Sequence, residues 1–302
     1  MNIPQSAKYD LRKIESQRIA RNCICCGGAN LHASPAIMMP FISHRVFGWA
    51  PTQIDETWGI RSIKKGMAYA ICNSLMCEDC SLLFMDLRFS DDELERLYKD
   101  YRGADYNRMR EFYEPDYKAR GEAFAFSVPY LKDTEEFILQ YISNPSTVLD
   151  WGGDTGLNTP LKNSAAEVVI YDISAKPADG GLQTDDKNRL AARSFDLICC
   201  MNVLEHVPFP SRVIREIKSF MDVGRSVLFI EVPFETLCFT KARNEQLPSK
   251  RHWHEHINFY SESSLKCLLE NSGMELVAFR CIETGGTGNQ AKVFQLLCKR
   301  VA

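Results

Sequence analysis

The sequence lacks the features that mark several classes of protein. No apolar run in its 302 residues is long enough to span a bilayer. The opening segment, MNIPQSAKYDLRKIESQRIARN, is polar and has no apolar signal core. An excess of positive charge is also missing, because the net charge of −3 gives no general attraction to nucleic acid. Internal repeats and low-complexity tracts are absent too. We therefore expect a cytoplasmic globular protein with a small-molecule ligand.

Three regions differ in composition. Residues 1–89 hold six of the twelve cysteines and few long apolar runs. We therefore expect this segment to need a cross-link, such as a bound metal ion, in order to fold. Residues 90–145 read as a helical connector, which begins at the capping-box spacing of Ser90 and Glu93. From residue 146 to 302, apolar strands alternate with amphipathic helices. This alternation predicts an α/β fold with a parallel sheet, and the last two strands, joined without a helix, predict an antiparallel end.

Four cysteines in residues 1–89 have the spacing of zinc ligands. Cys23 and Cys26 form one C-x-x-C pair, and Cys77 and Cys80 form a second. Two such pairs brought together make a tetrahedral site with four thiolates and no open position, which is the usual structural zinc site. Cys25 is an alternative to Cys23 as a ligand. A set of buried free thiols is the competing interpretation.

A glycine-rich turn between two apolar runs is the most informative motif. The segment VLDWGGDTG at 148–156 is followed by VVIYDIS at 168–174. The order strand, glycine turn, strand and acid is typical of a nucleotide site in a Rossmann-like fold. Dinucleotide sites need glycines at relative positions zero, two and five. Counting from Gly152 or from Gly153 fails that test, so NAD is not expected. A turn without a ligand is the alternative.

The same turn resembles motif I of class I S-adenosylmethionine (SAM) methyltransferases, acid-x-G-x-G-x-G, with Asp154 in the place of the middle glycine. The resemblance implies a Rossmann-like methyltransferase sheet with SAM as cofactor. Asp172 would then hold the ribose hydroxyls and Ile173 would pack on the adenine. The resemblance implies these cofactor-binding residues: Asp150, Gly152, Gly153, Gly156, Asp172, Ile173, Asp185, Met201 and Asn202.

Four of the six histidines lie in two short segments. Asn202–His206 (NVLEH) follows the fourth predicted strand, and His252–His256 (HWHEH) follows the fifth. Both loops leave the carboxyl edge of the sheet, where ligands bind in open α/β folds. A hydroxyl acceptor needs a base as its new bond forms, and histidine has the appropriate pKa. Structural loops are the competing interpretation, whereas zinc binding by HWHEH lacks the helical i, i+4 spacing.

The order of these parts resembles bacterial methyltransferases with an N-terminal zinc-binding domain, including the sugar C-methyltransferases of surface-polysaccharide biosynthesis. The run HEHINFYS is similar to a stretch of their active site. This resemblance implies that His256 is the base, with Glu255 as its partner and His206 as a second imidazole. It also implies that a connector tyrosine, Tyr101 or Tyr106, reaches the site.

The acceptor is expected to be a sugar or sugar-nucleotide. The loop before HWHEH carries Lys241, Arg243, Lys250 and Arg251, which suit a phosphate handle or form an ordinary solvated surface. Expected substrate-binding residues are Tyr101, Tyr106, His254 and Arg251. The further C-terminal domain usual in the C-methyltransferases is missing, which favours a hydroxyl oxygen as the methylated atom. The alternatives are methylation of a small non-sugar metabolite or amine, and a degenerate methyltransferase acting as a zinc-dependent scaffold.

Overall fold

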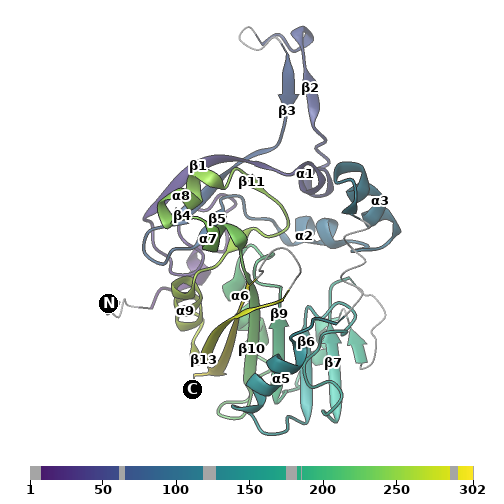
Figure 1. Ribbon diagram of the computed structural model, residues 1–302, viewed down its shortest axis with the longest axis vertical. Coiled ribbons are helices and arrows are strands. Elements are labelled where there is room, and N and C mark those ends of the chain that lie inside the picture. The colour runs from purple at the N-terminus through teal and green to yellow at the C-terminus, as the bar shows by residue number, and fades with distance from the viewer. Residues whose placement is uncertain are drawn as a thin grey trace.

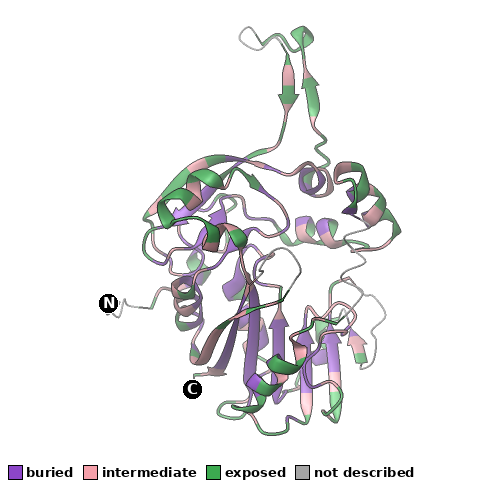
Figure 2. Cartoon of the chain, viewed as in Figure 1, coloured by how far each residue is buried: buried purple, intermediate pink, exposed green. Residues whose placement is uncertain are grey.

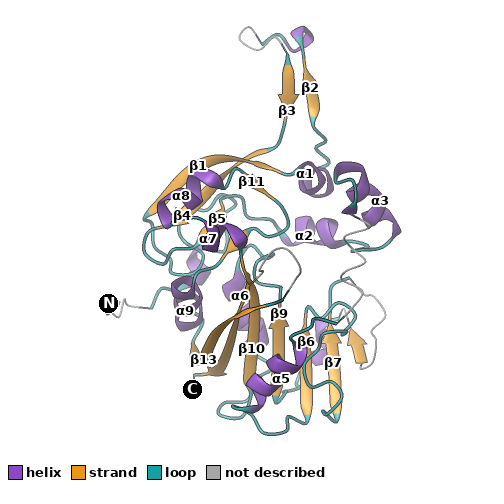
Figure 3. Ribbon diagram, in the orientation of Figure 1, coloured by secondary structure: helices purple, strands orange, loops and turns teal. Residues whose placement is uncertain are grey.

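A computed structural model describes residues 8–60, 65–117, 127–174, 182–184, 186–285 and 292–301. Two sheets stacked end to end form the body, with the larger sheet in the lower half of Figure 1 and the smaller one above it. Figure 3 shows the helices placed around both sheets. No helix within the described ranges is long and apolar enough to cross a membrane.

The larger sheet has seven strands and matches the predicted fold class. Its order is β13 (Met274–Glu283), β14 (Lys292–Arg300), β10 (Val227–Phe234), β9 (Leu197–Met201), β6 (Thr147–Trp151), β7 (Glu167–Tyr171) and β8 (Leu182–Thr184). The five strands from β10 to β8 are parallel, and β14 runs antiparallel to both of its neighbours. The predicted parallel sheet with an antiparallel end is therefore confirmed.

Helices cover the larger sheet on both faces. They are α5 (Leu131–Leu139), α6 (Pro210–Lys218) and α9 (Glu262–Asn271). Figure 2 shows the central strands as the most deeply buried part of the chain, as expected for a parallel sheet covered on both sides. The carboxyl ends of β6 and β9 point toward the smaller sheet, so the glycine turn and the NVLEH loop lie in the seam between the two sheets.

The smaller sheet combines segments from both ends of the chain. Its order is β11 (His252–Trp253), β1 (Leu31–Met38), β4 (Ile71–Cys77), β5 (Leu83–Met85) and β12 (Asn258–Phe259). β11 pairs with β1 and β12 pairs with β5. The HWHEHINF segment thus crosses back to complete the N-terminal sheet. The expected division into regions 1–89, 90–145 and 146–302 does not anticipate this exchange.

The connector lies over the seam as two helices, α2 (Asp91–Tyr98) and α3 (Ala104–Tyr113), next to α1 (Pro40–Phe47). The predicted capping box is present at the start of α2, where Ser90 and Glu93 bond each other's backbone amides. Two further short helices, α7 (Thr236–Thr240) and α8 (Arg243–Ser249), fill the loop before HWHEH. A two-stranded ribbon of β2 (Thr52–Ile54) and β3 (Gly66–Ala68) projects from the body.

Candidate active site and cysteine cluster

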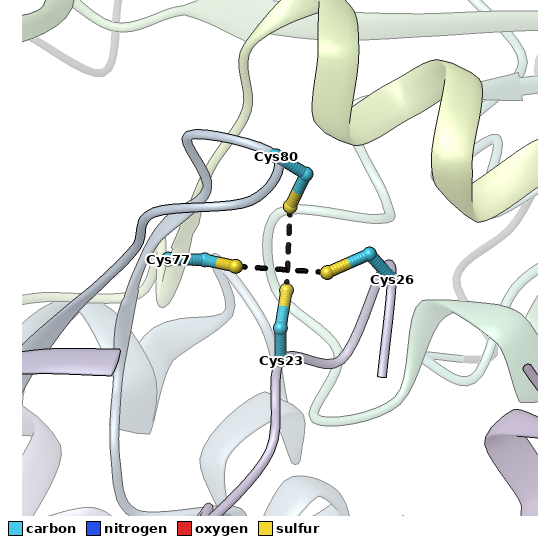
Figure 4. Close-up of side chains that lie close together, drawn as sticks. All are labelled: Cys23, Cys26, Cys77 and Cys80. Carbon is cyan, nitrogen blue, oxygen red and sulfur yellow. Dashed lines mark hydrogen bonds between the residues drawn. The ribbon is translucent and has the colours of Figure 1, made fainter. Parts of the chain in front are cut away.

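The four predicted zinc ligands converge on one point (Figure 4). Each C-x-x-C pair forms one knuckle of the cluster. The sulfur atoms of Cys23 and Cys80 lie 3.4 Å apart, and those of Cys26 and Cys77 lie 3.6 Å apart. All four sulfur atoms lie within 4.8 Å of one another. Cys25 is fully buried in the adjoining core and is not a member of this group. The geometry therefore selects Cys23 over Cys25.

The glycine turn is shaped for close approach. Gly152 has a φ of +79°, and a Cβ there would lie 2.4 Å from a methyl carbon of Val203. Gly156 has a φ of +74°, and a Cβ there would lie 2.1 Å from Ile170. Only glycine takes up such conformations without strain in so little space. The absence of a side chain at Gly152 also lets the turn lie directly against Val203 of the NVLEH loop.

Asp172 directly follows β7, and two backbone amides fix the orientation of its carboxylate. One of its carboxylate oxygens accepts from the backbone amide of Asp154 at 2.9 Å, and the other accepts from the amide of Ser174 at 2.8 Å. Each oxygen keeps a further lone pair for a ligand hydroxyl. The neighbouring Ile173 is 57% exposed, which leaves its side chain accessible to a ligand. Asp185, the tentative adenine contact, lies outside the described residues.

Asp150 is a buried carboxyl group beneath the glycine turn. One oxygen accepts from the hydroxyl of Thr159 at 2.5 Å, while the other has no hydrogen-bond partner among the described residues. Burial raises the pKa of Asp150 to about 6. A cationic or hydrogen-bonding ligand group above the turn would offset the cost of this orphaned oxygen. Gly153 packs directly on this carboxyl group, since a Cβ there would lie 2.5 Å from it.

Asn202 and Met201 end β9 at the floor of the same region. Asn202 has a φ of +54°, a left-handed conformation that is uncommon for a residue with a side chain. Its backbone amide donates to the Glu231 carbonyl at 2.9 Å, and its side-chain amide lies 3.5 Å from the Glu231 carboxylate. The sequence analysis did not single out Glu231, although an acid inside the apolar strand SVLFIEV was a visible signal.

His206 is held as a neutral imidazole. Its Nδ1 lies 3.0 Å from the Tyr98 hydroxyl and 3.1 Å from the Glu255 carbonyl. Burial, followed by the nearby His256, lowers the pKa of His206 to about 3. The ring meets the His256 ring edge-on, with the two centroids 4.7 Å apart. The two predicted histidine loops therefore do meet.

His256 is paired with Glu235 and not with Glu255. Its Nδ1 lies 2.5 Å from a carboxylate oxygen of Glu235. Burial pulls the pKa of His256 down, but the hydrogen bond and charge of Glu235 outweigh it and raise the value to about 8. The expectation that Glu255 orients His256 is wrong, because sequence neighbours in this extended segment point in different directions. Glu235, just after β10, was missed because it lies 21 residues away in sequence.

Glu255 belongs instead to a buried ionic network. It accepts from the Arg110 guanidinium at 2.6 Å and from the hydroxyl of Tyr106. Burial would raise the pKa of Glu255, but Arg110 outweighs it and holds the value at about 2. His254 joins the edge of the network through a 2.5 Å contact with Glu114. Tyr106 is fully buried in this network, so it does not reach an acceptor as expected.

Glu205 is the most anomalous group in the seam. Its side chain is fully buried, and within the described part of the chain neither carboxylate oxygen has a hydrogen-bond partner. Burial raises the pKa of Glu205 to about 7. Glu205, His206 and His256 each place one possible ligand atom within 4.8 Å of the others. This arrangement can share protons among three groups, and its donor set also suits a divalent cation.

The connector joins the histidines to the cofactor turn. Tyr98 contacts His206, and four residues later Arg102 lies 3.5 Å from the Asp154 carboxylate of the glycine turn. Between them, the Tyr101 ring packs against the ring of Tyr98 and beneath the Arg102 guanidinium. Together with the Gly152–Val203 contact, these interactions place the turn and the histidines along one seam. Arg251 is exposed, and its Nε donates to the Pro248 carbonyl.

A family model described as a methyltransferase domain matches residues 117–278, more than half of the chain. A ubiquinone biosynthesis O-methyltransferase of Azoarcus sp. is 29% identical over 151 residues, which cover 43% of this chain and 65% of that protein. A protein of the same name from Ralstonia nicotianae is 28% identical over 158 residues, covering 45% and 66%. The chain thus spans just under two thirds of these relatives.

Solved structures with a similar fold include two methyltransferases. One is the 1,6-didemethyltoxoflavin-N1-methyltransferase of Burkholderia thailandensis, at 13% identity and a TM-score of 0.47, covering 66% of this chain and 90% of that one. Another is the magnesium protoporphyrin IX methyltransferase of Synechocystis, at 16% identity and a TM-score of 0.42, covering 68% and 96%. On the family match, the chain belongs to the methyltransferase domain family and contains a class I SAM-dependent methyltransferase domain.

Proposed function

We propose that this protein transfers the methyl group of SAM to a hydroxyl oxygen of a small acceptor, with His256 as the proton acceptor. The observation that carries the proposal is the 2.5 Å pair of Glu235 and His256 at the carboxyl edge of the sheet. This pair lies beside the neutral His206 and in the same seam as the glycine turn. A base, its carboxylate partner and the cofactor turn therefore lie along one seam.

SAM fits the cofactor side of the seam. The two preoriented oxygens of Asp172 would bind the ribose hydroxyls, and the exposed Ile173 would pack on the adenine. The unpartnered oxygen of Asp150 would accept from the amino group of the methionine end, directly or through water. Asn202 and Met201 would line the floor. Bound here, SAM supplies a methyl group that is activated by the positive sulfonium.

The protein's part in the reaction is to orient the acceptor and remove its proton. The Glu235 carboxylate fixes the tautomer of His256 by accepting at Nδ1, which leaves Nε2 free to take the hydroxyl proton. As the acceptor oxygen forms its bond to the methyl carbon, the carbon–sulfur bond breaks and its electron pair stays on sulfur. Glu235 stabilises the imidazolium that results. His206, held by Tyr98, would help to orient the acceptor.

We also propose that Cys23, Cys26, Cys77 and Cys80 hold a structural zinc ion. Zinc–sulfur bonds of about 2.3 Å in a tetrahedron place sulfur atoms about 3.8 Å apart. The pairs at 3.4 and 3.6 Å need only a small expansion to meet this value. Four thiolates leave no position open for a substrate, so the ion's role is to join the two knuckles.

A hydroxyl acceptor is supported by two independent points. The relatives are named as O-methyltransferases, and a histidine–carboxylate base suits a hydroxyl, which is a poor nucleophile until it is deprotonated. The sugar or sugar-nucleotide acceptor rests on the resemblance in sequence and on the basic loop before HWHEH, and a role in polysaccharide biosynthesis gains no support from the comparisons. A phenolic hydroxyl is the second candidate acceptor, favoured by the ubiquinone biosynthesis enzymes to which the chain is similar.

The deciding experiment measures release of demethylated cofactor with a panel of sugar nucleotides, phenols, catechols and amines. Turnover with a hydroxyl compound, followed by identification of an O-methyl product, supports the proposal. His256→Gln should then lower turnover by about 10²–10⁴-fold. His252→Gln is the matched control, because His252 lies on β11 in the same segment but is exposed. Methylation of amines alone would contradict the proposal, and failure to bind SAM would favour the scaffold alternative.

The buried Glu205 favours one variation on this mechanism. With His206 and His256 it offers three ligand atoms within 4.8 Å, and a cation there would compete with a proton for the imidazoles. Assays of the zinc-loaded protein with and without added Mg²⁺ or Mn²⁺ separate the two cases. Turnover independent of added metal supports His256 as a base. Strict dependence on added metal, lost in Glu205→Gln, would favour a cation that activates the acceptor oxygen.

A further inference from the structure

Glu231 is a buried carboxylate that neither the cofactor turn nor the histidine pair uses. It lies on β10, level with Met201 of β9, and is only 2% exposed. Side chains alternate between the faces of a strand, so Glu231 shares a face with Phe229 and Val227, the face covered by α5. Asp150 points to this same face from β6, because it alternates with the buried Val148.

Every contact of Glu231 donates a hydrogen bond to it. The Gln295 amide donates to one oxygen at 2.6 Å. The Tyr130 hydroxyl and the Asn202 amide lie 3.0 and 3.5 Å from the other. Burial raises the pKa of Glu231, whereas the three donated hydrogen bonds and the charge of the nearby Arg280 act in the opposite direction and favour the ionised carboxylate. Among the described residues, no lysine, arginine or histidine forms an ion pair with Glu231.

The charges of two other carboxylates near the cofactor turn are stabilised by different partners. Asp154 lies 3.5 Å from the Arg102 guanidinium. Asp172 accepts from two backbone amides, one at each oxygen. Glu231, whose hydrogen-bond partners are also neutral, differs from them in its place directly behind Asn202. Since Asn202 is proposed to line the floor of the SAM site, the Glu231 carboxylate lies directly behind a side chain that would face the cofactor.

We propose that Glu231 is a positioning residue whose negative charge makes the pocket bind SAM in preference to its demethylated product. The inference rests on the proposed placement of SAM above Asn202. SAM carries a sulfonium charge that disappears when the methyl group leaves, so a buried carboxylate attracts the substrate form and not the product. At an effective dielectric constant of about 20, a unit negative charge within roughly 10 Å of the sulfonium corresponds to at least about a ten-fold difference in affinity.

The test compares the affinities of SAM and S-adenosylhomocysteine for the full-length, zinc-loaded protein by titration calorimetry. Glu231→Gln should weaken SAM by about ten-fold or more and change the affinity for S-adenosylhomocysteine by less than about two-fold. A purely structural role would weaken both ligands alike. An analogue that carries an ammonium in place of the methylsulfonium should lose affinity in Glu231→Gln as SAM does, because it has the same positive charge.

Two further variants separate charge from packing. Tyr130→Phe removes a donor but keeps the charge, so the ratio of the two affinities should hardly change. Glu231→Gln combined with Gln295→Glu keeps an amide–carboxylate pair across β10 and β14, where the two residues are directly opposed. This swap moves the charge one strand away from Asn202 and should reproduce the selective loss of SAM affinity even where the single variant folds poorly.

Asp172→Asn distinguishes this inference from the proposed function, because the ribose is common to both ligands and both should weaken equally. If the wild type binds neither ligand, the cofactor assignment itself fails. If both bind, Asp172→Asn weakens both, and neither Glu231→Gln nor the swap changes the affinity ratio, the cofactor assignment stands and the role of Glu231 is refuted.

Discussion

Replacing Glu235 with glutamine should change how methyl transfer depends on pH. Burial pulls the pKa of His256 down, but Glu235 outweighs it and holds the value at about 8. His256 therefore enters its base form as pH rises through about 8, and wild-type turnover should rise over the same range and then level off. Without the carboxylate, the pKa should fall to the ordinary imidazole value of about 6.5 or below.

The size of the effect follows from the fraction of His256 in its base form. At pH 6.5 this fraction is about 3% in the wild type and about 50% in Glu235→Gln. At pH 9 both proteins are almost entirely in the base form. The ratio of wild-type to variant turnover should therefore grow about fifteen-fold from pH 6.5 to pH 9. At high pH the variant should be slower by about 10²-fold or more, because Glu235 no longer orients the ring or stabilises the imidazolium.

The assay is single-turnover methyl transfer from pH 6 to 9.5, so that chemistry and not product release is followed. Glu245→Gln on the exposed surface of α8 is the matched control and should keep the wild-type profile. Two results would refute the reasoning. One is a variant profile with its midpoint still near 8, and the other is a uniform loss of rate at every pH. If His206→Ala removes the pH dependence instead, His206 is the base.

Three other perturbations give separate tests. Cys77→Ser should lower zinc content from about one ion per chain by metal analysis and reduce the melting temperature, whereas Cys72→Ser, outside the cluster, should keep its zinc. Asp172→Ala should weaken SAM by roughly 1–3 kcal/mol in calorimetry, and the wild type should give no heat with NAD. Glu205→Gln should stabilise the protein at pH 8 more than at pH 5. Burial raises the pKa of Glu205 from 4.5 to about 7, so the folded state loses stability as pH rises between these values, by up to about 3 kcal/mol. Equal melting shifts at both pH values would contradict the last assignment.

Patterns of neighbouring residues predicted those parts of the molecule that depend on interactions between residues close in sequence. The glycine turn was visible because its conformation needs glycine at Gly152 and Gly156. The capping box was visible because Ser90 and Glu93 are three residues apart on one helix turn. The alternation of strands and helices gave the sheet, since a parallel sheet requires crossover helices. The four cysteines were visible because metal knuckles have fixed local spacing.

Contacts between distant segments were not predictable in the same way. Glu235 and His256 face each other only because the chain leaves β10, forms α7 and α8, and returns to the smaller sheet as β11. Two-residue strands such as β11 and β12 carry no detectable periodicity, so their pairing with β1 and β5 left no mark in the sequence. The Arg110–Glu255 ion pair likewise depends on how α3 docks over the seam.

The exchange of β11 and β12 into the N-terminal sheet links the cysteine cluster to the proposed base. Cys77 ends β4, β4 pairs along its length with β1, and β1 pairs with β11 at His252. His256 follows β11 by three residues, just before β12. Loosening the knuckle at Cys77 should therefore disturb the position of His256 through two hydrogen-bonded strand pairs. A zinc site with no open coordination position would then support methyl transfer purely by holding the histidine segment against the larger sheet.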